Sequence, residues 1–68
     1  MLSRETFDKG INDLKLAFDM NLNLYQREIW YKYLQKLTDD EFMHNIKHHI
    51  EFCNYNPYIS DILNQPKN

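Results

Sequence analysis

Apolar residues recur at helical spacing in the first quarter of the chain. They follow one another at intervals of four, three and four positions: Phe7, Ile11, Leu14 and Phe18. This is the period of an amphipathic helix, and Ser3 precedes it as a candidate N-cap, because its hydroxyl can accept a hydrogen bond from a free backbone N–H. Gly10 interrupts the run, at a cost of about 1 kcal/mol relative to alanine. The pattern predicts a first helix over about residues 4–18.

A second apolar stripe begins after the connection DMNLNL. Asn23 is a candidate N-cap, and Gln26 stands three residues later, which is the spacing of a capping box. The stripe that follows is the widest in the chain and consists of Ile29, Trp30, Tyr33, Leu34 and Leu37. It predicts a second helix over about residues 24–37 that buries this stripe, with Trp30 in the core.

The strongest local signal is the tetrapeptide TDDE. Thr38 and Glu41 match a capping box, in which the hydroxyl and the carboxylate each satisfy a free backbone N–H, and the helix dipole favours the two aspartates between them. The apolar face beyond this turn is formed by Phe42, Ile46, His49, Ile50 and Cys53. We predict a third helix over about residues 39–53, with His49 and Cys53 as buried or half-buried groups rather than reactive ones.

Pro57 ends the third helix, because a proline pushes the residue before it, here Asn56, away from the helical conformation. Ser60 can then cap a short last helix over about residues 60–64. Its apolar contacts come from Ile59, Ile62 and Leu63. So short a helix needs tertiary packing to be stable in water, so we interpret it as the closing piece of the core. The alternative is a tail that docks on a partner.

These elements specify an all-α fold, a small bundle of three amphipathic helices plus a short C-terminal helix, in a single domain over residues 1–68. A hydrophobic content of 43% and an aromatic content of 15% indicate a folded chain rather than a disordered one. A core of this size supplies only about 3 to 5 kcal/mol of net stability. A homodimer is therefore one way for the chain to bury spare apolar surface.

Charge and cysteine usage narrow the function. The chain has ten acidic and eight basic residues, for a net charge of −2, and the basic residues are dispersed along it. Electrostatic binding to nucleic acid needs basic residues gathered in a stripe. Only Arg27, Lys32 and Lys36 offer a small patch, so we expect no direct nucleic-acid partner. Cys53 has no second cysteine to pair with, which favours a reducing compartment. Without a signal peptide or a long apolar run, we expect a cytoplasmic protein that does not bind membranes.

Two histidines form the one candidate for a metal site. His44 and His48 are four residues apart, and zinc uses such a pair on a helix. Glu41 and Glu51 flank them, but the glutamate position of HExxH is missing, so a solvated polar face is the simpler interpretation. No nucleophile can be placed beside His49, and the single glycine excludes a glycine-rich phosphate loop. We predict no metal, no cofactor and no enzymatic activity.

Three large side chains fall outside the apolar stripes. On a helical wheel, Tyr25 and Tyr31 lie off the stripe of the second helix, and Leu16 lies off that of the first. Tyrosine is enriched among the residues that dominate binding at interfaces, so these three are the candidate partner-binding residues. The alternative is that they are scattered surface residues of the ordinary kind.

Residues 24–63 resemble a known family. The helix with WYKYL, the turn TDDEF and the stretch KHHIEFCNYNPYISDI are similar to the folded N-terminal domain of the phage replicative helicase loader and inhibitor family. That family's last motif is a proline, a small or polar residue, isoleucine, a small residue, aspartate and isoleucine. In this chain the motif reads Pro57, Tyr58, Ile59, Ser60, Asp61 and Ile62.

The resemblance implies a phage or mobile-element protein of DNA replication that works by binding and without chemistry. Its expected partner is a bacterial replication protein, the replicative helicase or its loader, which it inhibits or redirects. The alternative is a phage-encoded inhibitor of another host enzyme, such as a restriction or CRISPR nuclease. The many asparagine, tyrosine, lysine and isoleucine residues agree with the AT-rich genome of a low-GC bacterium or its phage.

Overall fold

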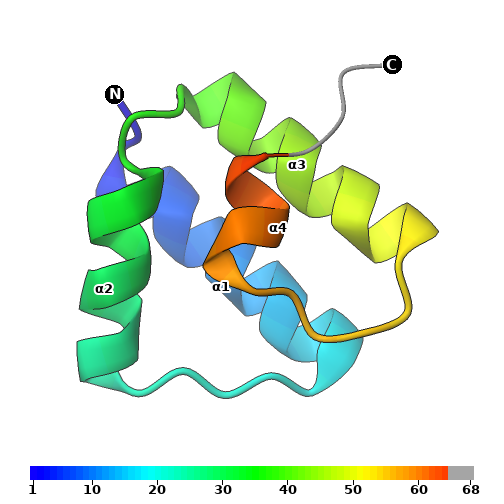
Figure 1. Cartoon of the computed structure of the whole chain (residues 1–68). Helices are drawn as coiled ribbons and strands as arrows, with labels where there is room; N and C mark the ends of the chain where they lie inside the picture. The colour runs from blue at the N-terminus through cyan, green and yellow to red at the C-terminus, as the bar shows by residue number, and fades with distance from the viewer. Residues whose placement is uncertain (65–68) are drawn as a thin grey trace.

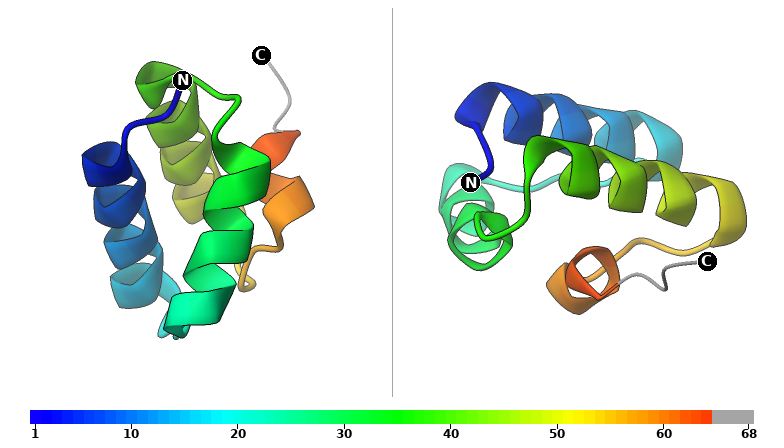
Figure 2. Two further views of the ribbon diagram at one scale, coloured as in Figure 1. Left: turned by 90° about the vertical axis from the view of Figure 1, so that its left-hand side faces the viewer. Right: turned by 90° about the horizontal axis from the view of Figure 1, so that it is seen from above.

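Four α-helices make up the part of the chain that the structure describes. This computed structural model describes residues 1–64, and its helices are α1 (Arg4–Phe18), α2 (Leu24–Leu34), α3 (Asp39–Phe52) and α4 (Ile59–Leu63). Helices α1 and α3 lie side by side and run in the same direction (Figure 1). Helix α4 packs against α2 and α3 (Figure 2). Residues 1–64 contain no strand, so the predicted all-α bundle is confirmed.

The three longer helices begin where the sequence predicts. The Ser3 hydroxyl accepts the Thr6 N–H at 3.2 Å at the start of α1. Both predicted capping boxes are present, one between Asn23 and Gln26 and the other between Thr38 and Glu41. These starts are predictable because each cap is a local interaction between residues three positions apart.

Two predicted boundaries of the helices are wrong. Helix α2 ends at Leu34 instead of residue 37. The Leu37 N–H donates to the Leu34 carbonyl in a tighter turn, and the Gln35 carbonyl accepts the N–H of Leu2. Ser60 does not cap the last helix, which begins at Ile59. Its first turn is closed instead by the Asp61 carboxylate, which accepts the backbone N–H of Tyr58 at 2.8 Å.

The C-terminal segment closes the core, as predicted. Pro57 is buried and the Ile62 side chain is fully inaccessible. The Asn45 side chain of α3 donates to the Ile62 carbonyl at 2.7 Å. The buried apolar residues are Leu2, Phe7, Ile11, Leu14, Met20, Trp30, Leu34, Phe42, Ile46 and Ile62. None of the helices within residues 1–64 has the length and apolar character to cross a membrane.

Gly10 allows the close approach of α1 and α3. A Cβ atom at this position would collide with the Phe42 ring, at 2.8 Å from Cζ, and would lie 3.3 Å from Cγ1 of Ile46. Both neighbours are fully buried and have little room to move. The glycine that lowers the helix propensity of α1 is therefore required by its packing.

Asp39 joins the N-termini of α1 and α3. Its carboxylate accepts the Ser3 backbone N–H at 2.8 Å and the Ser3 hydroxyl at 3.1 Å. The Ser3 N–H is the main reason that the pKa of Asp39 lies below its ordinary value of 3.8, with burial opposing the shift. The same carboxylate stands in the first turn of α3, where the helix dipole favours a negative charge.

We predict that Gly10→Ala destabilises the protein by about 1 to 3 kcal/mol, because the overpacking against Phe42 outweighs the gain in helix propensity. Urea unfolding followed by circular dichroism measures the change. Asn12→Ala is the matched control at an exposed position of α1, and it should be neutral or slightly stabilising. A Gly10→Ala protein as stable as the Asn12→Ala protein would contradict the packing of α1 on α3.

We predict that Asp39→Asn lowers the free energy of unfolding at neutral pH and that the difference from wild type shrinks in acid. The pKa of Asp39 is lower in the folded protein than in the unfolded chain. Its contribution is therefore complete above about pH 4 and is lost as the pH falls through the folded-state pKa. Unfolding curves between neutral pH and strong acid measure this, with Asp40→Asn at the exposed next position as the control. A difference that does not depend on pH would show that the charge of Asp39 is not responsible.

Candidate functional site

Apolar side chains are exposed along one side of α2. Tyr25, Ile29 and Tyr33 are spaced four residues apart, so they lie along the same side of the helix. Their exposed fractions are 81%, 51% and 51%. Lys32 and Lys36 are also exposed in this part of the chain. We call these residues the outer face of α2, although Lys36 belongs to the turn that follows the helix.

The outer face of α2 differs from the exposed surfaces of α1 and α3. Helix α1 exposes one large apolar side chain, Leu16, and α3 also exposes one, Phe52. Single exposed apolar residues are normal on a soluble protein, whereas an aligned group of them indicates an interaction site. The outer face of α2 is therefore the candidate site within residues 1–64.

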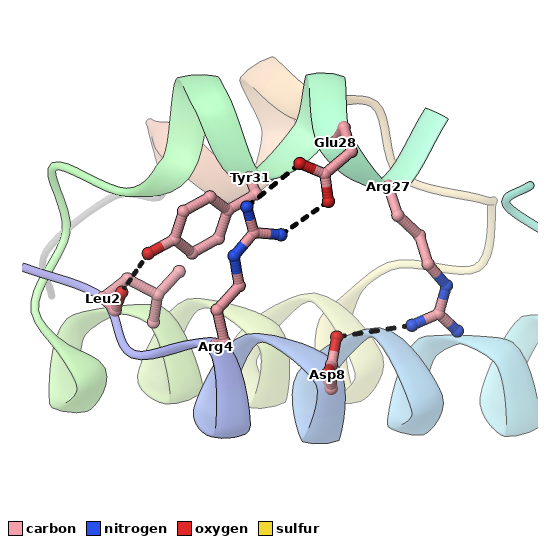
Figure 3. Close-up of polar contacts among 6 residues, drawn as sticks. All are labelled: Leu2, Arg4, Asp8, Arg27, Glu28 and Tyr31. Atoms are coloured by element: carbon pink, nitrogen blue, oxygen red, sulfur yellow. Dashed lines mark hydrogen bonds and ion pairs between the residues drawn. The ribbon is translucent and has the colours of Figure 1, made fainter. Parts of the chain in front are cut away.

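Tyr31 does not belong to this face, and the expectation that it is exposed is wrong. Its hydroxyl donates to the Leu2 carbonyl at 2.7 Å. Its ring contacts Phe7 edge-on, with 5.2 Å between the ring centroids, and the Arg4 guanidinium lies 3.8 Å above it. Figure 3 shows Tyr31 reaching from α2 to the N-terminal segment. The side chain thus packs α2 against the N-terminal segment.

Two ion pairs connect α2 to α1 (Figure 3). The Arg4 guanidinium donates two hydrogen bonds to Glu28, at 2.6 and 3.0 Å, and Arg27 lies 3.6 Å from Asp8. The hydrogen bonds from Arg4 lower the pKa of Glu28. An exposed pair of this kind adds little stability. Its consequence for the site is that the charges of positions 27 and 28 are directed toward α1.

Ile29 and Tyr33 are half exposed, which corrects the prediction that they lie in the buried stripe. The buried residues of α2 are Trp30 and Leu34, with exposed fractions of 8% and 0%. The side of α2 that packs on the rest of the protein also carries Tyr31, whose hydroxyl is hydrogen-bonded to the N-terminal segment. Positions 29 and 33 lie at the edge of this packed side and remain half exposed. One signal in the sequence points to the outer face, since Tyr25, Ile29 and Tyr33 form a second apolar row at intervals of four.

Leu16 and Tyr25 are exposed as predicted, but their surroundings differ. Leu16 is 76% exposed, and its neighbours one turn away along α1 are Asn12 and Asp13. It is thus an isolated apolar side chain among polar ones. Tyr25 continues into a row of apolar residues, so only Tyr25 keeps its place as a partner-binding candidate in the site.

The histidine pair on α3 lies beside a shallow hollow of about 210 Å³ lined by His44, Lys47, His48, Glu51 and Phe52. The imidazole rings of His44 and His48 are 6.4 Å apart between centroids. Nδ1 of His48 is buried without a hydrogen-bond partner, whereas a metal-binding histidine normally donates its second ring N–H to an acceptor. Within residues 1–64 no group of three or more potential ligands comes together. The pair is therefore poorly suited to hold a metal.

His49 is fully buried, as predicted, and holds a turn. Its Nε2 lies 3.0 Å from the Tyr55 carbonyl oxygen, and since a carbonyl only accepts, Nε2 carries the proton. The ring also meets Phe18 and Tyr55 edge-on. The Asp61 carboxylate, followed by burial and by Cys53, raises the pKa of the Tyr55 phenol.

Comparisons with known proteins add no relative: no family model, no curated protein and no solved structure matches the chain. The candidate site therefore depends on the geometry of residues 1–64 alone.

We predict that Tyr31→Phe lowers the free energy of unfolding by about 0.5 to 1.5 kcal/mol, because the Leu2 carbonyl loses its hydrogen-bond donor. Tyr25→Phe removes the same hydroxyl from an exposed ring and should leave the stability unchanged within about 0.5 kcal/mol. Urea denaturation of the three proteins measures both effects. Equal stabilities of the two variants would contradict the structural role of Tyr31.

Proposed function

We propose that this protein is a non-enzymatic interaction module that binds a bacterial replication protein, the replicative helicase or its loader, and inhibits or redirects it. The observation that carries the proposal is the outer face of α2, a row of exposed apolar side chains on a helix whose other side is fixed in the core. The identity of the partner follows from the resemblance of residues 24–63 to the helicase loader and inhibitor family. A phage or mobile-element origin and a cytoplasmic location belong to the same proposal.

The spacing of the apolar residues suits recognition of a helix by a groove. Partners that bind in this way read side chains one or two turns apart along one side of a helix, as Tyr25, Ile29 and Tyr33 are placed. Tyrosines are frequent among the residues that dominate such interfaces. The helix is also held in position before binding, by Tyr31 and by the pairs to α1, so little conformational entropy is lost when it docks.

The size of the face indicates a small interface. A tyrosine contributes about 150 to 250 Å² when it is fully buried, so two partly exposed tyrosines and one isoleucine fall short of the roughly 800 Å² per partner of a standard interface. Binding should therefore depend on a few side chains inserted into a pocket. This expectation makes the proposal testable by single substitutions.

We predict that Tyr25→Ala combined with Tyr33→Ala weakens binding to the purified replicative helicase of a low-GC bacterium by at least about tenfold. Biolayer interferometry with the full chain immobilised measures the affinity, and the helicase loader is tested in parallel. Leu16→Ala is the control, because it removes an exposed apolar side chain from another helix. Circular dichroism shows whether the variants are folded.

Loss of binding in the double variant, with normal binding in the Leu16→Ala protein, would support the proposal. The proposal fails if the wild-type protein binds neither the helicase nor the loader. Binding by the wild-type protein that the double variant retains would instead move the site away from α2. Binding to a restriction or CRISPR nuclease in place of the replication proteins would favour the inhibitor alternative.

A further inference from the structure

The charges of the chain are unevenly distributed around α2. Residues 24–37 contain three basic side chains and one acidic, for a net charge of +2, whereas the other residues contain five basic and nine acidic, for a net charge of −4. The segment that carries the outer face is therefore the positive part of an acidic protein. Such segregation favours a partner of opposite charge at this face and orients its approach.

Within residues 24–37, the positive charges without an ion pair are those of Lys32 and Lys36. Arg27 is paired with Asp8, and Glu28 is paired with Arg4. Lys32 and Lys36 are exposed and have no ion pair within residues 1–64. The Lys32 ammonium lies 5.7 Å from the centroid of the Tyr33 ring, so charge and apolar surface adjoin each other.

We infer that the surface receiving α2 is an apolar groove bordered by carboxylates. Tyr25, Ile29 and Tyr33 would fill the groove, and Lys32 and Lys36 would face acidic side chains on its rim. This inference rests on the proposed function, because it specifies the chemistry of the same protein partner. It assigns the affinity to the apolar row. The two lysines would set the rate of association and its dependence on salt.

A second copy of this chain fits the face less well than an acidic partner does. If two outer faces paired with their helices parallel, Lys32 and Lys36 of one copy would lie close to those of the other, and like charges facing each other across an interface oppose association. The apolar row is also too small to offset this repulsion with a standard interface. Nucleic acid fits poorly too, since two free lysines neutralise few phosphates and the row beside them is apolar.

The test uses the purified helicase as the probe and two charge-reversal variants of the full chain. Lys32→Glu with Lys36→Glu changes the outer face, and Lys9→Glu with Lys15→Glu makes the same change in net charge at exposed positions of α1. Association and dissociation rates are measured at low and at high salt. Substitution of Lys32 and Lys36 by glutamine removes the two charges without reversing them, and circular dichroism verifies that the variants are folded.

We expect reversal at Lys32 and Lys36 to slow association about tenfold at low salt, with the difference from wild type shrinking at high salt because salt screens exposed charges. The glutamine variant should lie between, and reversal at Lys9 and Lys15 should have at most a twofold effect. Equal effects of the two reversals, with binding still lost in the tyrosine variant, would overturn this inference and leave the proposed function standing. Absence of any binding by the wild-type protein would overturn the proposed function and this inference with it.

Two further measurements complete the test. Sedimentation of the protein at low salt should show a monomer, and a dimer abolished by Tyr25→Ala would assign the face to a second copy instead. Titration with duplex and single-stranded oligonucleotides should show no binding. Salt-dependent binding that is lost in the Lys32 and Lys36 variant would make nucleic acid the partner and overturn the inference.

Discussion

Leu2 and Ser3 connect the start of α1 to both ends of the turn between α2 and α3. The Leu2 N–H donates to the Gln35 carbonyl at 3.0 Å, and its own carbonyl accepts the Tyr31 hydroxyl at 2.7 Å. The next residue, Ser3, donates its N–H to Asp39 at 2.8 Å. The Leu2 side chain is buried at the same place, with 1% of its surface exposed. The N–H and carbonyl of Leu2 are thus hydrogen-bonded at the point where its side chain enters the core, and buried backbone groups need such partners.

This connection and the packing of Trp30 and Leu34 together leave one side of α2 exposed. In the orientation that α2 adopts, Tyr31 reaches Leu2 while Trp30 and Leu34 enter the core. Tyr25, two turns earlier on the other side, then points to solvent. The outer face is thus the side of α2 away from the buried residues Trp30 and Leu34, in the orientation in which Tyr31 reaches Leu2. A fixed helix with an exposed apolar row is suited to binding, and its lysines give that row a preferred partner charge.

Local interactions made much of the fold predictable from the sequence. The starts of α1, α2 and α3 follow from caps that involve residues three positions apart, and Pro57 marks the return of the chain. The end of α2 was less predictable. Helix α2 stops where the Gln35 carbonyl turns to Leu2, a contact between residues 33 positions apart in the sequence.

The site was only partly predictable, for the same reason. A helical wheel shows that α2 has apolar residues on more than one side, but the choice of the buried side depends on the neighbouring segments. Tyr31 was assigned to the surface and Ile29 to the core, and tertiary hydrogen bonding reverses both assignments. Gly10 likewise looks unfavourable in isolation, and its purpose becomes clear only beside Phe42.

The connection made by Leu2 and Ser3 can be tested by amide hydrogen exchange of the full chain, observed residue by residue by nuclear magnetic resonance. Residues at a chain terminus usually exchange fast, because they fray without unfolding of the rest. The amide hydrogens of Leu2 and Ser3 should instead exchange slowly, in the range of the core amides of α3, because both are hydrogen-bonded to other elements. Exchange of these two amides at the rate of an unstructured peptide would contradict the account, since the N-terminal segment would then not hold α2 in its orientation.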